Sequence, residues 1–249
     1  MNYIPRLIAH RGASAAAPEN TLPAVELAWK EGADGVEVDV RMTADSKIVC
    51  VHDVDMKRVA GKPLVVAEQN LEALQQLDVG SWKGPEFKDT RILLLSELLE
   101  KMPGGKHLFI EVKVDVEIVP ALLETIDQSN IELRQVTVMA FDIEVLKKLK
   151  QKRPELKVLW LVEGKSNWLG RSNLKIEDIM ETLIQTKVDG LGIESHKGIT
   201  REMAKAVLGA GLKLNIWTVD KPAEAQRYAT FAVSSITSNQ PALILNALR

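Results

Sequence analysis

The stretch from His10 to Asp53 reads HRGASAAAPENTLPAVELAWKEGADGVEVDVRMTADSKIVCVHD, and the rest of the chain is organised around it. Its hydrophobic periodicity predicts a strand ending at His10, a helix over Asn20–Gly32 and an alternating strand over Gly35–Arg41. A strand, a helix and a second strand in this order form the repeating unit of a parallel sheet. The same stretch contains two of the four histidines, a carboxylate pair and an arginine.

The alternation of short apolar runs and amphipathic helical patterns continues to the end of the chain. Later strand-like runs are His107–Val114, Arg134–Phe141, Lys157–Val162, Val188–Ile193, Leu212–Trp217 and Ala232–Ile236. Helical patterns separate them, and Pro241–Leu248 can supply a last helix. This rhythm of about eight β/α units predicts a TIM (β/α)8 barrel. An open doubly wound sheet is the less favoured alternative, because the polar residues come from several strand ends and not from one crevice.

One connection departs from this rhythm. Lys47–His52 follows the preceding strand after only a short polar turn, whereas a parallel crossover needs about a dozen residues. We therefore expect this strand to return antiparallel, as a hairpin. The polar stretch that comes next contains a possible helix at Ala67–Leu77. We interpret it as a small insertion, at about 54–90, within a single domain spanning residues 1–249.

The composition excludes several classes of protein. The chain has 249 residues, 46% apolar and 27% charged, which is ordinary for a globular protein. A net charge of −2 provides no basic field for nucleic acid and no polybasic patch for a membrane. The single cysteine, Cys50, excludes an intrachain disulfide and a cysteine-rich zinc site. No membrane helix or signal peptide is predicted, so a cytoplasmic location is expected, with a periplasmic one as the alternative. The oligomeric state stays open.

Val36-Glu37-Val38-Asp39-Val40 is the sharpest local signal for chemistry. In a strand, Glu37 and Asp39 share one face and the valines the other, with the carboxylates ~6.6 Å apart along the strand. In a barrel the acidic face points inward, where two carboxylates repel each other unless a cation lies between them. Such oxygen ligands suit Mg²⁺ or Ca²⁺. The alternative is an edge strand with solvated acids.

A second acidic pattern lies on the next barrel strand, in Ile110-Glu111-Val112-Lys113. Adjacent strands are about 4.8 Å apart, so Glu111 can complete a three-carboxylate cation site with Glu37 and Asp39. Lys113, which shares the face of Glu111, would contact an anion held by the cation. A plain Glu–Lys pair is the alternative.

Two histidines complete the candidate site. His10, followed by Arg11, ends the first strand, and His52 ends the return strand of the hairpin, which brings it beside the acids. Two histidines around a cation suit acid–base phosphoryl chemistry, in which one activates the nucleophile and the other protonates the leaving alkoxide. We interpret His107 and His196 as core or surface residues, because one opens its strand and the other lies in a polar turn.

Several neighbouring residues have supporting interpretations. Asn20 is expected to cap the helix that follows the first strand. Glu19 can hold the adjacent arginine or a histidine. Trp217, at the end of its strand, can form a wall of a substrate pocket, while Trp82 and Trp168 are weaker wall candidates.

The ordered set HRG, PENT, EVDV, VHD, EVK and WTV resembles the glycerophosphodiester phosphodiesterase family. Each motif is weak, but their order over most of the chain is specific. The resemblance implies a TIM barrel with an inserted subdomain, one divalent cation (Mg²⁺ or Ca²⁺), and hydrolysis of glycerophosphodiesters to sn-glycerol 3-phosphate and an alcohol. It further implies His10 and His52 as the acid–base pair, Glu37, Asp39 and Glu111 as metal ligands, Arg11 and Lys113 as phosphate contacts, and Trp217 as a substrate wall.

The chain departs from the family pattern at two places. The stretch RILLLSELLE lacks a proline that many relatives have, and ITSNQP, ending at Pro241, lacks the acid of an ITD-P-like motif. Two rival functions stay open: a lysophospholipase D-like or phosphoinositide-cleaving activity, which needs an apolar route for acyl chains, and a non-catalytic barrel that binds a phosphoester. The residues also leave open which histidine is the acid, and whether water or the glycerol hydroxyl attacks.

Overall fold

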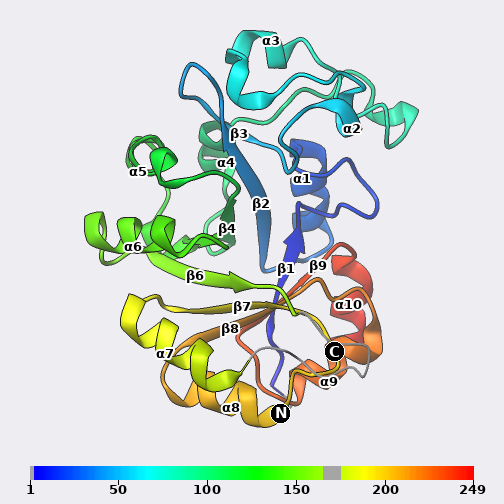
Figure 1. Cartoon of the computed structure of the whole chain (residues 1–249). Coiled ribbons are helices and arrows are strands. Elements are labelled where there is room, and N and C mark those ends of the chain that lie inside the picture. Colours follow the sequence, from blue (N-terminus) through cyan, green and yellow to red (C-terminus); the bar gives the residue numbers. More distant parts are fainter. Residues whose placement is uncertain (1–2, 165–174) are drawn as a thin grey trace.

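The computed structural model describes residues 3–164 and 175–249, and its centre is a closed barrel of parallel strands surrounded by helices (Figure 1). The barrel strands in the described residues are β1 (Arg6–His10), β2 (Gly35–Met42), β4 (His107–Val112), β5 (Val136–Ala140), β6 (Lys157–Val162), β7 (Gly190–Glu194), β8 (Lys213–Trp217) and β9 (Ser235–Ser238). Because β1 pairs in parallel with both β2 and β9, the sheet closes on itself. The predicted TIM (β/α)8 barrel is confirmed, and the open-sheet alternative is wrong.

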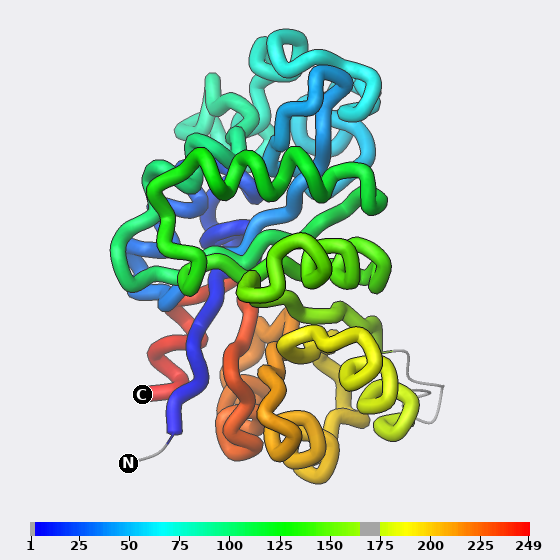
Figure 2. Tube along the Cα trace, turned by 90° about the vertical axis from the view of Figure 1, so that its left-hand side faces the viewer, coloured from blue at the N-terminus to red at the C-terminus, as the bar shows by residue number. Residues whose placement is uncertain are grey.

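The helices lie outside the barrel with their apolar faces toward the strands (Figure 1). The longer ones are α1 (Leu22–Lys30), α4 (Leu95–Lys101), α5 (Val119–Asp127), α6 (Ile143–Lys152), α7 (Ile176–Thr186), α8 (Arg201–Gly209), α9 (Pro222–Ala229) and α10 (Pro241–Leu248). The C-terminal helix α10 runs beside β1 and α9, which brings the last helix next to the first strand (Figure 2). Among the residues described, no helix combines the length and apolarity needed to cross a membrane.

Helix α6 shows how the local sequence produces this arrangement. Asp142 precedes the helix and accepts a hydrogen bond from the Glu144 N–H (2.8 Å), which satisfies one free donor of the first turn. Val145, Leu146 and Leu149 recur at helical spacing and are fully buried against the sheet, while the lysines of the helix remain outside the core.

Alternate side chains along each strand point into the barrel, where they form successive layers. The middle of the barrel is filled by an apolar cluster with Trp217 packed on it: Ile8, Phe109, Met139, Leu159 and Leu161. Toward the carboxyl ends of the strands, the inward side chains become polar, with His10 following Ile8 and Glu111 following Phe109 at two-residue spacing. The apolar layer thus forms the floor beneath these polar side chains.

The predicted hairpin is confirmed. β3 (Ile48–Cys50) pairs antiparallel with β2, with Val40 opposite Cys50, and the Val51 N–H donates to the Asp39 carbonyl (2.9 Å). The chain therefore returns along β2 toward the acids, and His52 follows directly.

The segment after β3 folds over a small apolar cluster of its own, made of Val49, Val51, Met56, Val59, Val66, Leu74, Val79 and Ile92. It contains α2 (Lys57–Ala60), η1 (Val66–Glu68), α3 (Leu71–Gln75) and η2 (Pro85–Phe87), and it projects from the barrel (Figure 1). The continuous helix expected at Ala67–Leu77 is wrong: Gln69 and Asn70 are extended, and they separate η1 from α3.

The last barrel strand begins three residues later than the sequence pattern predicted. Ala232 has a φ of 57° and donates a hydrogen bond to the Ala229 carbonyl (3.0 Å), so it belongs to the turn after α9. The strand continues to Ser238, which brings Asn239 to the carboxyl end of the barrel.

Candidate active site

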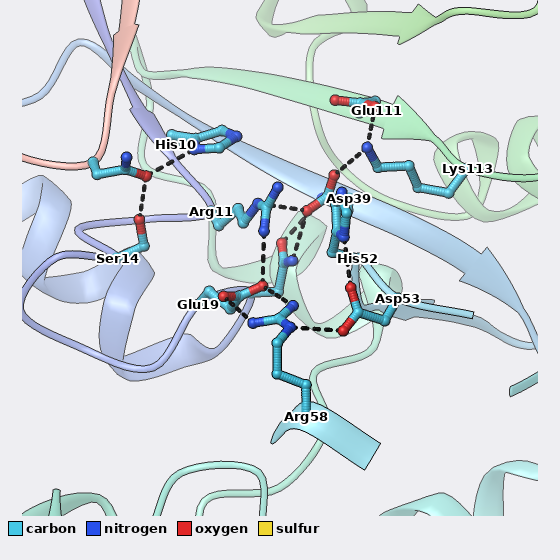
Figure 3. Close-up of polar contacts among 12 residues, drawn as sticks. His10, Arg11, Ser14, Glu19, Asp39, His52, Asp53, Arg58, Glu111 and Lys113 are labelled. Atoms are coloured by element: carbon cyan, nitrogen blue, oxygen red, sulfur yellow. Dashed lines mark hydrogen bonds and ion pairs between the residues drawn. The ribbon is translucent and has the colours of Figure 1, made fainter. Parts of the chain in front are cut away.

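The carboxyl ends of β1, β2 and β4 bring the predicted acids together. Figure 3 shows two of them, Asp39 and Glu111, on either side of the Lys113 amine. The strand registers place His10 opposite Glu37 and Asp39 opposite Glu111. All three carboxyl groups are buried, and each offers an oxygen within 4.8 Å of the other two. We call Glu37, Asp39 and Glu111 the carboxylate cluster.

Two cationic side chains contact the cluster, and both lie at ion-pair distance from Asp39. The Arg11 Nε lies 3.0 Å from Asp39 Oδ2, and the Lys113 Nζ lies 3.1 Å from Asp39 Oδ1. Lys113 also forms an ion pair with Glu111. Lys113 therefore bridges two of the acids, so the plain Glu–Lys pair considered from the sequence is present, but as part of a larger network.

Glu37 has no arginine or lysine side chain at ion-pair distance within the described part of the chain. Its Oε2 accepts a hydrogen bond from the Arg11 backbone N–H (2.9 Å), while its buried Oε1 has no hydrogen-bond partner among the described residues. Arg11 has a φ of 56°, in the left-handed region, which aims this N–H at the acid. An unsatisfied buried carboxylate oxygen is costly and calls for a ligand.

Because the two cations lie nearer to Asp39 than to Glu37, the pKa values of the three carboxyl groups shift in different directions. Burial, together with the negative charge of Asp39, raises the pKa of Glu37 well above its usual value. The same two causes raise the pKa of Glu111 to about 6. Burial would also raise the pKa of Asp39, but the Arg11 and Lys113 charges hold it below its ordinary value. Three carboxylates facing two cations, with an oxygen left unsatisfied, match the donor set of a hard divalent cation.

Asn20 supports the cluster in a way that the sequence did not reveal. Its Nδ2 donates to Asp39 Oδ2 (2.8 Å), and its Oδ1 accepts from the Asp39 backbone N–H (3.0 Å). The expected N-cap role is wrong: α1 begins at Leu22, preceded by Thr21, and Asn20 has a φ of 57°. Asparagine tolerates the left-handed backbone region, and this was the one local indication that Asn20 could lie outside the helix. It could not identify Asp39 as the partner, because Asp39 lies 19 residues away.

His10 is half-buried beside the cluster. Its Nε2 lies 3.9 Å from Glu37 Oε2, and its Nδ1 lies 2.7 Å from Asn239 Oδ1. Burial, reinforced by the positive charge of Arg11, lowers the pKa of His10 to about 4. The ring is therefore neutral at pH 7, as a proton acceptor must be.

His52 is more exposed and is held by the inserted segment (Figure 3). Its Nδ1 lies 2.7 Å from Asp53 Oδ1, and Asp53 Oδ2 accepts from the Arg58 Nε (2.7 Å). The hydrogen bond from Arg58, followed by that from His52, lowers the pKa of Asp53 to about 2. Arg58 also binds Glu19 through two hydrogen bonds, of 2.7 and 2.8 Å, and Glu19 accepts from Arg11 (2.9 Å), one of the contacts expected for it. Arg58 thus links both histidine-bearing segments.

Trp217 and Phe141 lie at the mouth of the barrel. Trp217, at the carboxyl end of β8, packs edge-on against Phe141, with the ring centroids 5.7 Å apart. Phe141, which was not a candidate from the sequence, follows β5, and its ring centroid lies 6.0 Å from the Lys113 Nζ. Trp82 lies in the insertion, exposed, with its indole N–H bonded to the Val79 carbonyl (2.9 Å). Trp168 lies outside the described residues.

The remaining histidines lie apart from the cluster. His107 opens β4, at the amino end of the barrel, and His196 follows β7, where its Nδ1 accepts from the Gly198 N–H (3.0 Å). Near the end of the last strand, where the family's acid is missing, Asp220 after β8 accepts a hydrogen bond from the Asn239 Nδ2 (2.6 Å), a contact not foreseen from the sequence.

Comparisons with known proteins agree with this geometry. The sequence profile described as Glycerophosphoryl diester phosphodiesterase family matches residues 10–243. A glycerophosphodiester phosphodiesterase of Caldanaerobacter subterraneus subsp. tengcongensis is 29% identical over 254 residues, covering 98% of this chain and 97% of that protein. The Bacillus subtilis (strain 168) protein YhdW is 30% identical over 242 residues, 96% of each chain. Among solved structures, an Oleispira antarctica phosphodiesterase in complex with the product sn-glycerol-3-phosphate matches with a TM-score of 0.86 and 28% identity, over 98% of this chain and 97% of that one.

Proposed function

The chain belongs to the glycerophosphoryl diester phosphodiesterase family and is an enzyme of that activity, and we propose that it works by metal-assisted acid–base catalysis at the carboxylate cluster. The products are sn-glycerol 3-phosphate and an alcohol. The observation that carries the proposal is Glu37: it is buried, has no lysine or arginine side chain at ion-pair distance in the described chain, and lies 3.9 Å from His10.

Glu37, Asp39 and Glu111 would hold one divalent cation, Mg²⁺ or Ca²⁺. Bound there, the cation neutralises charge on the phosphate oxygens of the substrate. Arg11 and Lys113 border the cluster and supply further N–H donors for those oxygens.

The two histidines move the protons. One takes the proton of the attacking hydroxyl, which is either water or the glycerol hydroxyl of the substrate, and the other protonates the departing alcohol. Each ring has its Nδ1 bonded to an oxygen acceptor, Asn239 for His10 and Asp53 for His52, which leaves the two Nε2 atoms for the substrate.

The aromatic edge formed by Phe141 and Trp217 is proposed to contact the alcohol side of the substrate. Lys113 lies 6.0 Å from the Phe141 ring, so a charged group borders this edge. This environment favours a polar head group over the acyl chain of a lysophospholipase D-like or phosphoinositide substrate. A non-catalytic barrel is disfavoured because every residue proposed for catalysis is present. The proposed location is cytoplasmic, with no nucleic acid partner.

The proposal is tested by following sn-glycerol 3-phosphate release from glycerophosphocholine, with lysophosphatidylcholine as the competing substrate. His10→Ala and His52→Ala are each expected to lower kcat by about 10²–10⁴-fold with the fold intact. Chelation is expected to stop turnover, and Mg²⁺ or Ca²⁺ to restore it. Near-full activity of either variant, or of the chelated enzyme, would remove the corresponding part of the proposal.

A further inference from the structure

The residue that holds His10 is itself held by a carboxylate. Asp220 Oδ1 accepts hydrogen bonds from the Asn239 backbone N–H (2.8 Å) and the Ser238 hydroxyl (2.9 Å), and Asp220 Oδ2 accepts from the Asn239 Nδ2 (2.6 Å). These bonds connect the loop after β8 to the end of β9. Asp220 therefore fixes the orientation of the Asn239 side chain independently of the contact between Asn239 and His10.

The network also determines which way the Asn239 amide points. An ionised carboxylate only accepts hydrogen bonds, so the amide nitrogen must face Asp220. The amide oxygen then faces the other side, where it lies 2.7 Å from His10 Nδ1 and accepts from the Ser14 hydroxyl (2.8 Å) (Figure 3). Because this oxygen has no proton to donate, His10 Nδ1 must carry the hydrogen of that bond.

We propose that Asn239 and Asp220 are positioning residues that hold His10 as the Nδ1–H tautomer, with its unprotonated Nε2 directed at the carboxylate cluster. This inference rests on the proposed function, in which His10 takes part in proton transfer. It assigns the base role to His10: Nε2 takes the proton of the attacking hydroxyl, Nδ1 keeps its own, and the resulting imidazolium stays bonded to Asn239. His52 is then the acid.

Asn239 lies between His10 and Asp220, so an amide and not a carboxylate contacts the histidine ring. A carboxylate bonded directly to Nδ1 would place a negative charge against the ring and stabilise its protonated form. The neutral amide transmits the orientation set by Asp220 without placing that charge on His10. A second carboxylate at position 239 would also lie 2.6 Å from Asp220, where two negative charges repel.

The experiment compares Asn239→Leu, Asn239→Asp and the reciprocal swap Asp220→Asn with Asn239→Asp, all in the full chain. The matched control is Gln128→Leu, which removes a surface amide bonded to the Glu124 carboxylate (3.0 Å). Three quantities are measured: thermal stability, kcat and KM for glycerophosphocholine, and long-range ¹H–¹⁵N NMR spectra of ¹⁵N-histidine-labelled protein. These spectra show which ring nitrogen is protonated, and His10→Ala identifies the His10 signals among the four histidines.

We expect wild-type His10 to be the Nδ1–H tautomer. In Asn239→Leu, His10 should no longer be fixed as the Nδ1–H tautomer, and kcat should fall by about 10²-fold. KM should change little, because the base is misoriented while the phosphate contacts remain. Asn239→Asp should also lose activity. The swap should recover part of it with Nδ1 protonated, because every donor again meets an acceptor, although a carboxylate now contacts the ring. Gln128→Leu should match the wild type in all three measurements.

A wild-type His10 that is protonated at Nε2 overturns the proposal outright. So does a folded Asn239→Leu variant with normal kcat, or one that loses activity while its tautomer is unchanged. If Asn239→Leu does not fold, the swap decides: activity no higher than that of Asn239→Asp overturns the proposal. These results are distinguishable from failure of the proposed function, since an active His10→Ala variant refutes the role of His10 whatever its tautomer.

Discussion

Replacing Glu37 by glutamine tests whether the carboxylate cluster is a cation site or an ion-pair network that is complete without a cation. The substitution keeps the side-chain shape and an acceptor for the Arg11 N–H, but removes the one cluster carboxylate without an arginine or lysine partner in the described chain. The ion pairs of Arg11 and Lys113 with Asp39 do not involve Glu37. The variant should therefore fold and should lose cation binding.

The magnitude follows from linkage between binding and unfolding. A cation present at a hundred times its Kd stabilises the folded wild type by about 2.7 kcal/mol. For a chain of this length, each kcal/mol raises Tm by about 2–4 °C, so the expected rise is about 5–11 °C. In Glu37→Gln the rise should be under about 2 °C, because only two of the three proposed carboxylate ligands remain.

The assay is thermal unfolding at pH 7.5, first in chelator and then with Mg²⁺, Ca²⁺ or Mn²⁺ added stepwise. Glu181→Gln, at an exposed acid of α7, is the matched control and should respond as the wild type does. An equal rise in Glu37→Gln and wild type would place the cation elsewhere. No rise in the wild type with any of the three cations would refute the reasoning behind the site.

Three further predictions concern the surroundings of the cluster. Because the folded pKa of Glu111 is raised to about 6, the stability of the chelated wild type relative to chelated Glu111→Gln should fall as pH increases from about 4.5 through 6; taking this difference removes the opposite contribution of His10, whose pKa is lowered to about 4, and a difference that grows with pH would contradict the prediction. Arg58→Gln should lower kcat by about 10–100-fold, because Asp53 and Glu19 lose their shared partner, with Arg58→Lys recovering part of it; unchanged kinetics would exclude a role for the insertion in catalysis. Asn20→Ala should reduce the free energy of unfolding by about 1–3 kcal/mol, measured by urea titration, because the buried Asp39 loses two hydrogen bonds; a wild-type midpoint and slope would refute that.

The sequence was informative where a side chain's surroundings depend on local periodicity. Strand alternation placed Glu37 and Asp39 on one face, and the alternating pattern of the neighbouring strand placed Glu111 beside them, as the strand registers show. The short polar turn before Lys47 predicted the antiparallel return that carries His52 back along β2. These inferences need only the period of a strand and the length of a connection, both of which are visible in the chain.

The supporting contacts could not be predicted in the same way. Arg58 meets Glu19 across 39 residues and Asn239 meets His10 across 229, and no local rule links positions so far apart. Asn20 was misread for the same reason: its side chain satisfies a distant strand, so the helix begins without a side-chain cap. Lys113 was placed correctly on its face, but its bridge between Asp39 and Glu111 depends on the inter-strand register.

The central claim is that the carboxylate cluster holds a divalent cation, and anomalous X-ray diffraction from crystals soaked in Mn²⁺ tests it most directly. We predict one manganese peak within about 2.0–2.3 Å of an oxygen from each of Glu37, Asp39 and Glu111, absent in Glu37→Gln crystals. A manganese peak elsewhere, or a cluster without one in which Lys113 still bridges Asp39 and Glu111, would contradict the account.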